Sequence, residues 1–211
     1  NMYNFISHTW NPIKGKCFHD CKYCYMKRFE LKEIRLEEKE LRSNLGENNF
    51  IFVGSGTDVF AVDVPREWIE RIISHCKNFD NRYLFQSKNP FYFRFFDMPD
   101  KTVLGTTIES NRHYKDIMGR VMTPAARAHC MAEYDNYIFD KMVTIEPVLD
   151  FDTLELVDMI KEVNPDWVNI GADSKGHGLP EPDKEKIKDL ISLLSEFTEV
   201  KIKPNLERLM R

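Results

Sequence analysis

The sequence lacks several features that would assign it to a specialised class of protein. No run of about 18 apolar residues occurs, so no segment is long and apolar enough to cross a membrane as a helix. Cysteine is scarce, with 5 residues in 211, and an odd, low count does not suit a disulfide-stabilised secreted domain. Internal repeats and low-complexity tracts are also missing. We therefore expect one domain over residues 1–211, located in the cytoplasm, where thiols stay reduced.

An excess of positive charge is missing as well. The chain has 30 Lys and Arg against 34 Asp and Glu, which gives a net charge of −4. The sequence therefore carries no overall electrostatic signature of a nucleic-acid-binding protein. Basic residues do gather locally, at Lys14, Lys16, Lys22, Lys27 and Arg28, and again at Arg112, Lys115, Arg120 and Arg127. Both groups are interpreted as solvated faces.

Three closely spaced cysteines are the most informative feature that the sequence does contain. Cys17, Cys21 and Cys24 have the spacing C-x3-C-x2-C, and the next cysteine, Cys76, lies far along the chain. A metal site with a purely structural role usually has four protein ligands, whereas three thiolates on a [4Fe-4S] cluster leave one iron free to bind a small molecule. The spacing therefore favours an iron–sulfur cluster with one open iron.

A zinc site remains an alternative, because the three cysteines together with His19 or His8 could form a Cys3His set. Zinc sites usually combine two groups of ligands separated by a dozen or more residues, and no second group is evident here. Cys76 and Cys130 fall in expected helices, where lone cysteines usually act as small buried hydrophobes, so no second cluster is predicted.

The rest of the chain alternates between strand-like and helix-like segments. Runs rich in β-branched and aromatic residues predict strands at 5–9, 50–53, 83–86, 103–108, 141–145, 167–170 and 200–202. Amphipathic stretches with start and stop signals predict helices at 25–41, 65–77, 90–96, 124–137, 153–163 and 183–197. Asp152 and Asp183 are expected to cap the last two of these helices. The alternation predicts an α/β fold with a parallel sheet, either doubly wound or a β/α barrel.

Polar residues follow the predicted strands, where both architectures place functional loops. They occupy positions 54–58, 87–89, 107–111, 146–147 and 171–176, and the cysteine segment follows the first strand at the same edge. The sequence therefore predicts a single functional rim at the carboxyl ends of the strands.

The cysteine motif, with an aromatic residue before its last cysteine, resembles the cluster loop of radical S-adenosylmethionine (SAM) enzymes. More narrowly, the chain is similar to the phage Gp37/Gp68-like family of radical SAM proteins. The matching segments are TWNP at 9–12, FVGS at 52–55 with DVF at 58–60, SKNP at 87–90, TPAA at 123–126, IEP at 145–147 and WVNIG at 167–171. This resemblance implies a partial (β/α)6 barrel that holds a [4Fe-4S] cluster and SAM at its open mouth.

The resemblance also implies a chemistry and a set of partners. An external one-electron donor such as flavodoxin or ferredoxin would reduce the cluster, and SAM would be cleaved to a 5′-deoxyadenosyl radical that abstracts hydrogen from a substrate. The family does not assign that substrate, and its phage context favours a nucleotide or nucleic acid. A non-catalytic binding module stabilised by zinc or by an iron–sulfur cluster is the alternative function.

Residue roles follow from the same resemblance. Cys17, Cys21 and Cys24 would be the iron ligands, and Tyr23 would pack near the adenine of SAM. The expected SAM-binding residues are Ser55, Gly56 and Asp58 at the amine, Ser87 and Lys88 at the carboxylate, and Glu109 at the ribose. Glu146, Asp173 and Lys203 lie at later strand ends and are expected to bind substrate or move protons.

Overall fold

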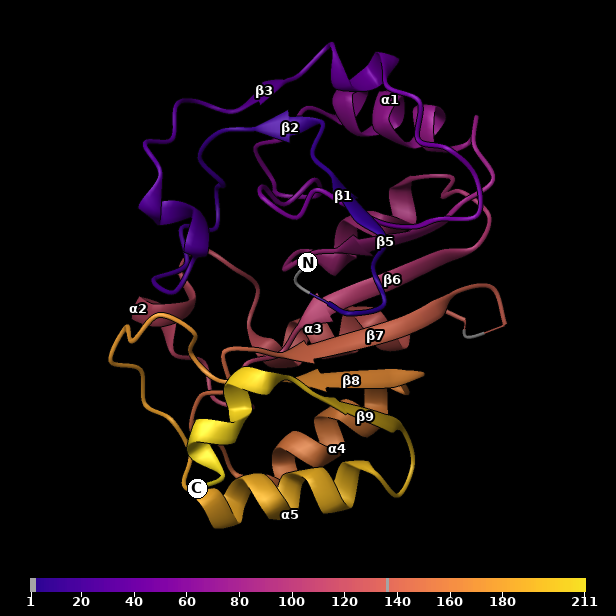
Figure 1. The fold of residues 1–211 in the computed structure, drawn as a ribbon. Coiled ribbons are helices and arrows are strands. Elements are labelled where there is room, and N and C mark those ends of the chain that lie inside the picture. Colours follow the sequence, from indigo (N-terminus) through magenta and orange to yellow (C-terminus); the bar gives the residue numbers. More distant parts are fainter. Residues whose placement is uncertain (1–2, 136) are drawn as a thin grey trace.

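The computed structural model describes residues 3–135 and 137–211. Its main feature is a parallel sheet of seven strands in the order β1-β4-β5-β6-β7-β8-β9 (Figure 1). The strands are β1 (His8–Trp10), β4 (Phe50–Val53), β5 (Arg82–Gln86), β6 (Thr102–Thr107), β7 (Asp140–Ile145), β8 (Trp167–Ile170) and β9 (Glu199–Ile202). Each neighbour in the sheet follows in chain order, so the predicted α/β class and the partial barrel are confirmed.

Helices cover one face of this sheet. They are α1 (Arg66–Cys76), α3 (Pro124–Ala132), α4 (Thr153–Val163) and α5 (Lys184–Leu194), with a short α2 (Lys115–Met118) and 3₁₀ turns at Tyr25–Arg28, Glu40–Arg42, Pro90–Phe95 and Pro204–Leu209. Ile69 of α1, Ile160 of α4 and Leu190 of α5 are fully buried in the same core as the strand residues Ile51 and Val143. Burial of these helix faces is the main stabilising contribution of this layer.

Local capping explains some of the helix boundaries. Asp183 accepts a hydrogen bond from the Lys186 amide at 2.9 Å and begins α5, and left-handed Asn164, with φ 51°, ends α4. Asp152 occupies the expected N-cap position of α4, but its side chain makes no capping hydrogen bond. Its carboxylate instead accepts from the Arg112 guanidinium, with Oδ2 at 2.8 Å from Nε.

The expected helix over 25–41 is the main error in the prediction. Tyr25–Arg28 forms a 3₁₀ turn, and the chain then extends into β3 (Arg35–Leu36), which pairs antiparallel with β2 (Ile13–Lys14). Ile34, Leu36 and Leu41 pack against the main core rather than forming one helical stripe. Tertiary pairing therefore overrides the helix propensity of this charged segment. Similarly, α3 ends at Ala132, short of 137, and position 136 lies outside the described residues.

The N-terminal segment packs across the concave face of the sheet. Tyr3 and Ile6 are buried against inward-facing residues of successive strands, among them Phe52, Met142 and Trp167. Phe5 adds an edge-on contact with Trp167 at 5.6 Å between ring centroids. This apolar layer fills the lower part of the barrel, so the interior is open towards the carboxyl ends of the strands. No helix in the described residues is long and apolar enough to span a membrane.

Candidate functional site

A cavity of about 1240 Å³ lies at the carboxyl ends of the strands. Its walls come from the cysteine segment and from the loops that follow β4, β5, β7 and β8, with residues near the end of β9. Figure 1 shows both the cysteine segment, in indigo, and the orange loop that leads from β8 to α5 at the ends of the strands. The predicted functional rim is therefore one continuous site.

The three cysteines of the motif all line this cavity. Cys21 is buried, Cys17 and Cys24 are half-buried, and all three are free thiols. Burial, with the nearby Asp58 carboxylate, raises the pKa of the Cys17 thiol to about 12, and burial also raises the pKa of the Cys21 thiol. These two thiols are therefore protonated at neutral pH, and a metal could bind them only by displacing their protons.

The donor set fits an iron–sulfur cluster better than a single zinc ion. Within the described residues, no three His, Cys, Asp or Glu side chains converge closely enough to hold one ion. The His19 ring cannot complete a Cys3His set, because Nε2 lies 2.7 Å from Asp58 Oδ2 and Nδ1 lies 3.1 Å from the Arg120 carbonyl oxygen. Three thiols spaced around one cavity, without a fourth cysteine beside them, suit a multi-iron cluster with an open position.

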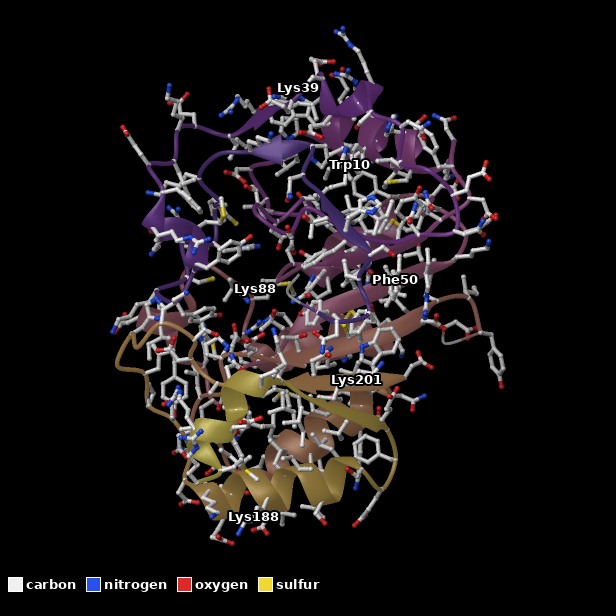
Figure 2. The ribbon with its side chains drawn as sticks, viewed as in Figure 1. Trp10, Lys39, Phe50, Lys88, Lys188 and Lys201 are labelled. Carbon is white, nitrogen blue, oxygen red and sulfur yellow. The ribbon has the colours of Figure 1, made fainter. Side chains whose placement is uncertain are left out.

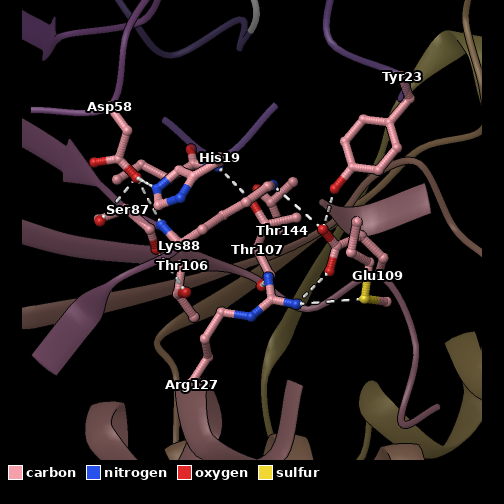
Figure 3. Close-up of polar contacts among 12 residues, drawn as sticks. His19, Tyr23, Asp58, Ser87, Lys88, Thr106, Thr107, Glu109, Arg127 and Thr144 are labelled. Atoms are coloured by element: carbon pink, nitrogen blue, oxygen red, sulfur yellow. Dashed lines mark hydrogen bonds and ion pairs between the residues drawn. The ribbon is translucent and has the colours of Figure 1, made fainter. Parts of the chain in front are cut away.

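Asp58 anchors the cysteine segment to the loop after β4. Besides His19, its carboxylate accepts hydrogen bonds from Ser87 Oγ and the Lys88 and Phe60 amides, each at 2.9 Å (Figure 3). Burial alone would raise the pKa of Asp58, but His19 and these donors hold it below its usual value. Both ring nitrogens of His19 lie against oxygen atoms, so these contacts fix the orientation of the ring. The Asp58 carboxylate therefore already has its hydrogen-bonding partners within the protein.

Glu109 is the centre of a second buried network (Figure 3). Its carboxylate accepts from Arg127 Nη2 at 2.7 Å and from the Tyr23 hydroxyl, and it lies 3.3 Å from Lys88 Nζ. Burial alone would raise the pKa of Glu109, but the positive charges of Arg127 and Lys88 lower it to about 2. Arg127 is fully buried, so its interpretation as part of a solvated basic face is wrong.

Lys88 connects this network to the cavity. Its ammonium lies 5.3 Å from the centroid of the Tyr23 ring, and its side chain lines the cavity beside the cysteines. Figure 2 shows Lys88 between the N-terminal part of the chain, in indigo, and the C-terminal part, in yellow. Tyr23 also lines the cavity, whereas Glu109 is not among the lining residues. The predicted ribose-binding role of Glu109 remains a prediction.

The segment after β4 approaches the cysteines from another side. Ser55, Gly56 and Asp58 all line the cavity, as does Ser87 after β5. Asn11 Oδ1 accepts from the Gly56 amide at 2.9 Å and from Ser55 Oγ at 3.2 Å, which fixes this turn against the end of β1. The structure thus brings the predicted SAM-binding residues other than Glu109 to one wall.

The later strand ends form the opposite wall. Lys203 Nζ donates to Glu146 Oε2 at 2.5 Å, and Asn205 Nδ2 donates to Glu146 Oε1 at 2.8 Å. Asp173 Oδ1 lies 2.6 Å from His177 Nδ1. Glu146, Asp173 and Lys203 all line the cavity, as predicted from their places at the strand ends. Their predicted roles in substrate binding or proton movement remain predictions.

The floor of the cavity is polar, a feature that the sequence analysis missed. The Tyr3 hydroxyl donates to Gln86 Oε1 at 2.8 Å and lies 2.7 Å from Thr144 Oγ1, while Gln86 Nε2 donates to Thr107 Oγ1 at 3.0 Å. The sequence did contain a signal for this layer. Side chains alternate between the two faces of a strand, and the last inward-facing side chains of β5, β6 and β7 are the polar Gln86, Thr107 and Thr144. This layer separates the cavity from the apolar packing beneath it.

Known structures show the same fold. The chain is similar to a doubly substituted spore photoproduct lyase with bound AdoMet and dinucleoside spore photoproduct, with a TM-score of 0.64 and 13% identity over 92% of this chain and 75% of that chain. A spore photoproduct lyase complexed with dinucleoside spore photoproduct gives a TM-score of 0.63 and 12% identity over 90% and 74%. No family model matches the chain, and no curated protein matches it in sequence. The similarity to the phage Gp37/Gp68-like family therefore remains a prediction.

Proposed function

We propose that the protein is a radical SAM enzyme. The observation that carries this proposal is the placement of exactly three motif cysteines on one cavity at the carboxyl ends of a seven-stranded parallel sheet. Support comes from the fold, which is that of a spore photoproduct lyase whose structure contains bound AdoMet. Cys17, Cys21 and Cys24 would hold a [4Fe-4S] cluster, and the adjoining wall would bind SAM. When bound, the cluster supplies the electron that cleaves SAM to a 5′-deoxyadenosyl radical.

The residues of the chain have physical tasks in such a reaction. Lys88 offers a partly buried ammonium at the cavity wall, which would bind the carboxylate of SAM through a charge-assisted hydrogen bond. Ser55 and Gly56 would contact the amine end, and Tyr23 would lie beside the adenine. Asp58 would act mainly by fixing His19 and the loop of Lys88, because its oxygens already accept four hydrogen bonds. Tyr3 and the apolar layer below it exclude water from the lower barrel.

The opposite wall would receive the substrate. Glu146 and Lys203 form an ion pair at the cavity surface, so they could orient a polar group or transfer a proton between carboxylate and ammonium. Asp173 would position His177 for the same task. We propose a nucleotide or nucleic acid as the substrate and a flavodoxin or ferredoxin as the electron donor.

The test is electron paramagnetic resonance of the anaerobically reconstituted, reduced protein with and without SAM. A [4Fe-4S] signal that shifts when SAM is added is the expected result, because SAM binds the iron that lacks a protein ligand. Formation of 5′-deoxyadenosine is measured in the same samples. Zinc in place of iron, or a signal that SAM leaves unchanged, would contradict the proposal and favour the non-catalytic binding module.

Two cysteine variants provide a matched comparison. Cys21→Ala removes a thiol that lines the cavity, whereas Cys76→Ala removes a thiol buried in α1 away from the cavity. We expect Cys21→Ala to lose its bound iron and its signal, while Cys76→Ala keeps both. Equal iron content in the two variants would show that the motif does not bind the cluster.

A further inference from the structure

The cations that line the cavity are of two kinds. Lys27, Lys88 and Lys203 each have a carboxylate partner, which is Asp20, Glu109 and Glu146 respectively. The other lining cations are Lys16, Arg28 and Lys175, and within the described residues none of them has a carboxylate within 4 Å. All three side chains are exposed. Positive charge that forms no close ion pair therefore lies along the mouth of the cavity, with Lys16 acting on Asp20 only at longer range, although the whole chain has a net charge of −4.

Aromatic rings lie beside this charge. The Arg28 guanidinium carbon is 4.7 Å from the centroid of the Phe29 ring and 5.8 Å from that of the Tyr25 ring. Phe29 is 50% exposed, although it is large and apolar, and both aromatic residues line the cavity. An exposed ring with a guanidinium against it offers a flat surface on which a planar ligand can stack.

The three unpaired cations come from separate segments. Lys16 precedes the first cysteine, Arg28 ends the 3₁₀ turn after the last one, and Lys175 lies in the loop between β8 and α5. A ligand that uses all of them needs negative charge at several points. The combination of spaced negative charges and flat rings is characteristic of a polynucleotide strand.

We infer that the mouth of the cavity binds a single-stranded polynucleotide, with phosphates on Lys16, Arg28 and Lys175 and a base stacked on Phe29. This inference rests on the proposed function and narrows its substrate from a nucleotide to a strand. In a duplex the base faces are already stacked on each other, so the Phe29 contact selects for unpaired bases. Lys16 and Arg28 therefore form part of a binding surface rather than a merely solvated face.

The inference is tested by fluorescence anisotropy with the full-length, anaerobically reconstituted protein and a short fluorescein-labelled oligothymidylate, with a matching oligouridylate in parallel. We expect the single strand to bind more tightly than the duplex, and the free mononucleotide to compete poorly. Three phosphate contacts predict a slope of log K against log salt of about −2, since each contact contributes about −0.7 for single strands. The tighter-binding of the two strands shows whether the mouth prefers the deoxyribose of DNA or the ribose of RNA.

Charge-reversal variants show whether the mouth carries the binding. The double variant Arg28→Glu/Lys175→Glu should lose most of its affinity and show a shallower salt slope, and Phe29→Ala should weaken binding about tenfold through the lost stacking contact. Lys39→Glu is the matched control, because Lys39 is exposed and lies far from Lys88 and the cavity (Figure 2). Equal affinities for the double variant and Lys39→Glu would overturn the inference.

Competition with polyglutamate distinguishes a strand from an acidic peptide. If polyglutamate competes as well as the unlabelled oligonucleotide and Phe29→Ala has no effect, the mouth recognises negative charge alone and the inference is wrong. The outcome is independent of the radical reaction. A SAM-sensitive cluster signal without strand binding overturns this inference but leaves the proposed function standing. Strand binding without that signal overturns the proposed function but leaves strand binding at the mouth standing.

Discussion

The Nε2 atom of His19 lies 2.7 Å from Oδ2 of Asp58, and this contact joins the middle of the cysteine motif to the loop after β4. The two side chains are almost completely buried, with 5% and 10% of their surfaces exposed. A histidine between two cysteines could be taken for a metal ligand, yet both of its ring nitrogens contact the protein. Its role is to hold the segment that carries the thiols.

Replacing His19 is therefore expected to loosen the cysteine segment. His19→Ala leaves the buried Asp58 carboxylate without its His19 partner, which should destabilise the protein by about 3 kcal/mol. Iron bound per chain should fall as well, although no thiol is removed. Urea unfolding and iron analysis measure the two effects. His113→Ala, at an exposed position, is the control. Unchanged iron content in His19→Ala would contradict the positioning role.

Arg127 is expected to be one of the most sensitive positions for stability. Arg127→Met removes the closest cationic partner of a buried carboxylate and should cost about 3–5 kcal/mol in the free energy of unfolding. The double variant Arg127→Met/Glu109→Gln should recover part of this loss, because the unpaired charge is gone. Denaturant unfolding of the two single variants and the double variant measures the coupling. Additive losses would show that the ion pair is not the source of the effect.

Acid should weaken the protein partly through Glu109. Its pKa falls from about 4.5 to about 2 on folding, so the unfolded chain binds its proton first as the pH falls. This stabilisation, on the order of 3 kcal/mol, is fully present above about pH 5 and is lost as the pH approaches 2. The difference in unfolding free energy between the wild type and Glu109→Gln should shrink over that range. A constant difference over that range would contradict this contribution of Glu109.

Lys88 is expected to determine the affinity for SAM. Lys88→Met keeps an unbranched stem of four heavy atoms but removes the ammonium, and the loss of a charge-assisted hydrogen bond should raise the Kd for SAM about tenfold or more. A titration of SAM followed by paramagnetic resonance gives the Kd. Lys188→Met, on α5 at the outer surface in Figure 2, should bind SAM normally. Equal Kd values in the two variants would exclude the assigned contact.

Gly119 and Gly176 form a matched pair for testing the support of the cysteine segment. Both have positive φ, at 79° and 67°, so both alanine variants suffer backbone strain. A Cβ at Gly119 would also lie 2.1 Å from the His19 carbonyl oxygen, whereas a Cβ at Gly176 would meet nothing within 4 Å. We expect Gly119→Ala to unfold at a clearly lower urea concentration and to bind less iron than Gly176→Ala. If the two variants unfold at the same urea concentration and bind equal amounts of iron, the close packing of Gly119 against His19 does not support the cysteine segment.

The sequence predicted what depends on local patterns. Runs of β-branched and aromatic residues located the seven strands of the sheet, because buried parallel strands are continuously apolar. The rim could be predicted because parallel strands all end at one edge, so the three cysteines and Glu146 had to meet there. The charged segment 25–41 was predicted wrongly, because its leucines and isoleucines serve tertiary contacts rather than one helix face.

Pairings between distant residues were not predictable. Nothing in the basic segment that contains Arg127 distinguishes it from its exposed neighbours, yet it is completely buried against Glu109. The role of Asn11 in fixing the turn at Gly56, and that of Tyr3 on the cavity floor, also depend on which strands become neighbours. Such contacts follow from the topology of the sheet and not from local spacing.

The anchors of the cysteine segment have a consequence for the order of assembly. The motif spans eight positions, but His19 contacts residues 39 and 101 positions away, and Tyr23 contacts a residue 86 positions away. Contacts between residues so distant in sequence form late in folding, because closing long loops costs entropy. The thiols reach their final arrangement only when most of the sheet exists. We therefore expect a peptide of the motif alone to lack this geometry, and iron to be inserted into a chain that is already largely folded.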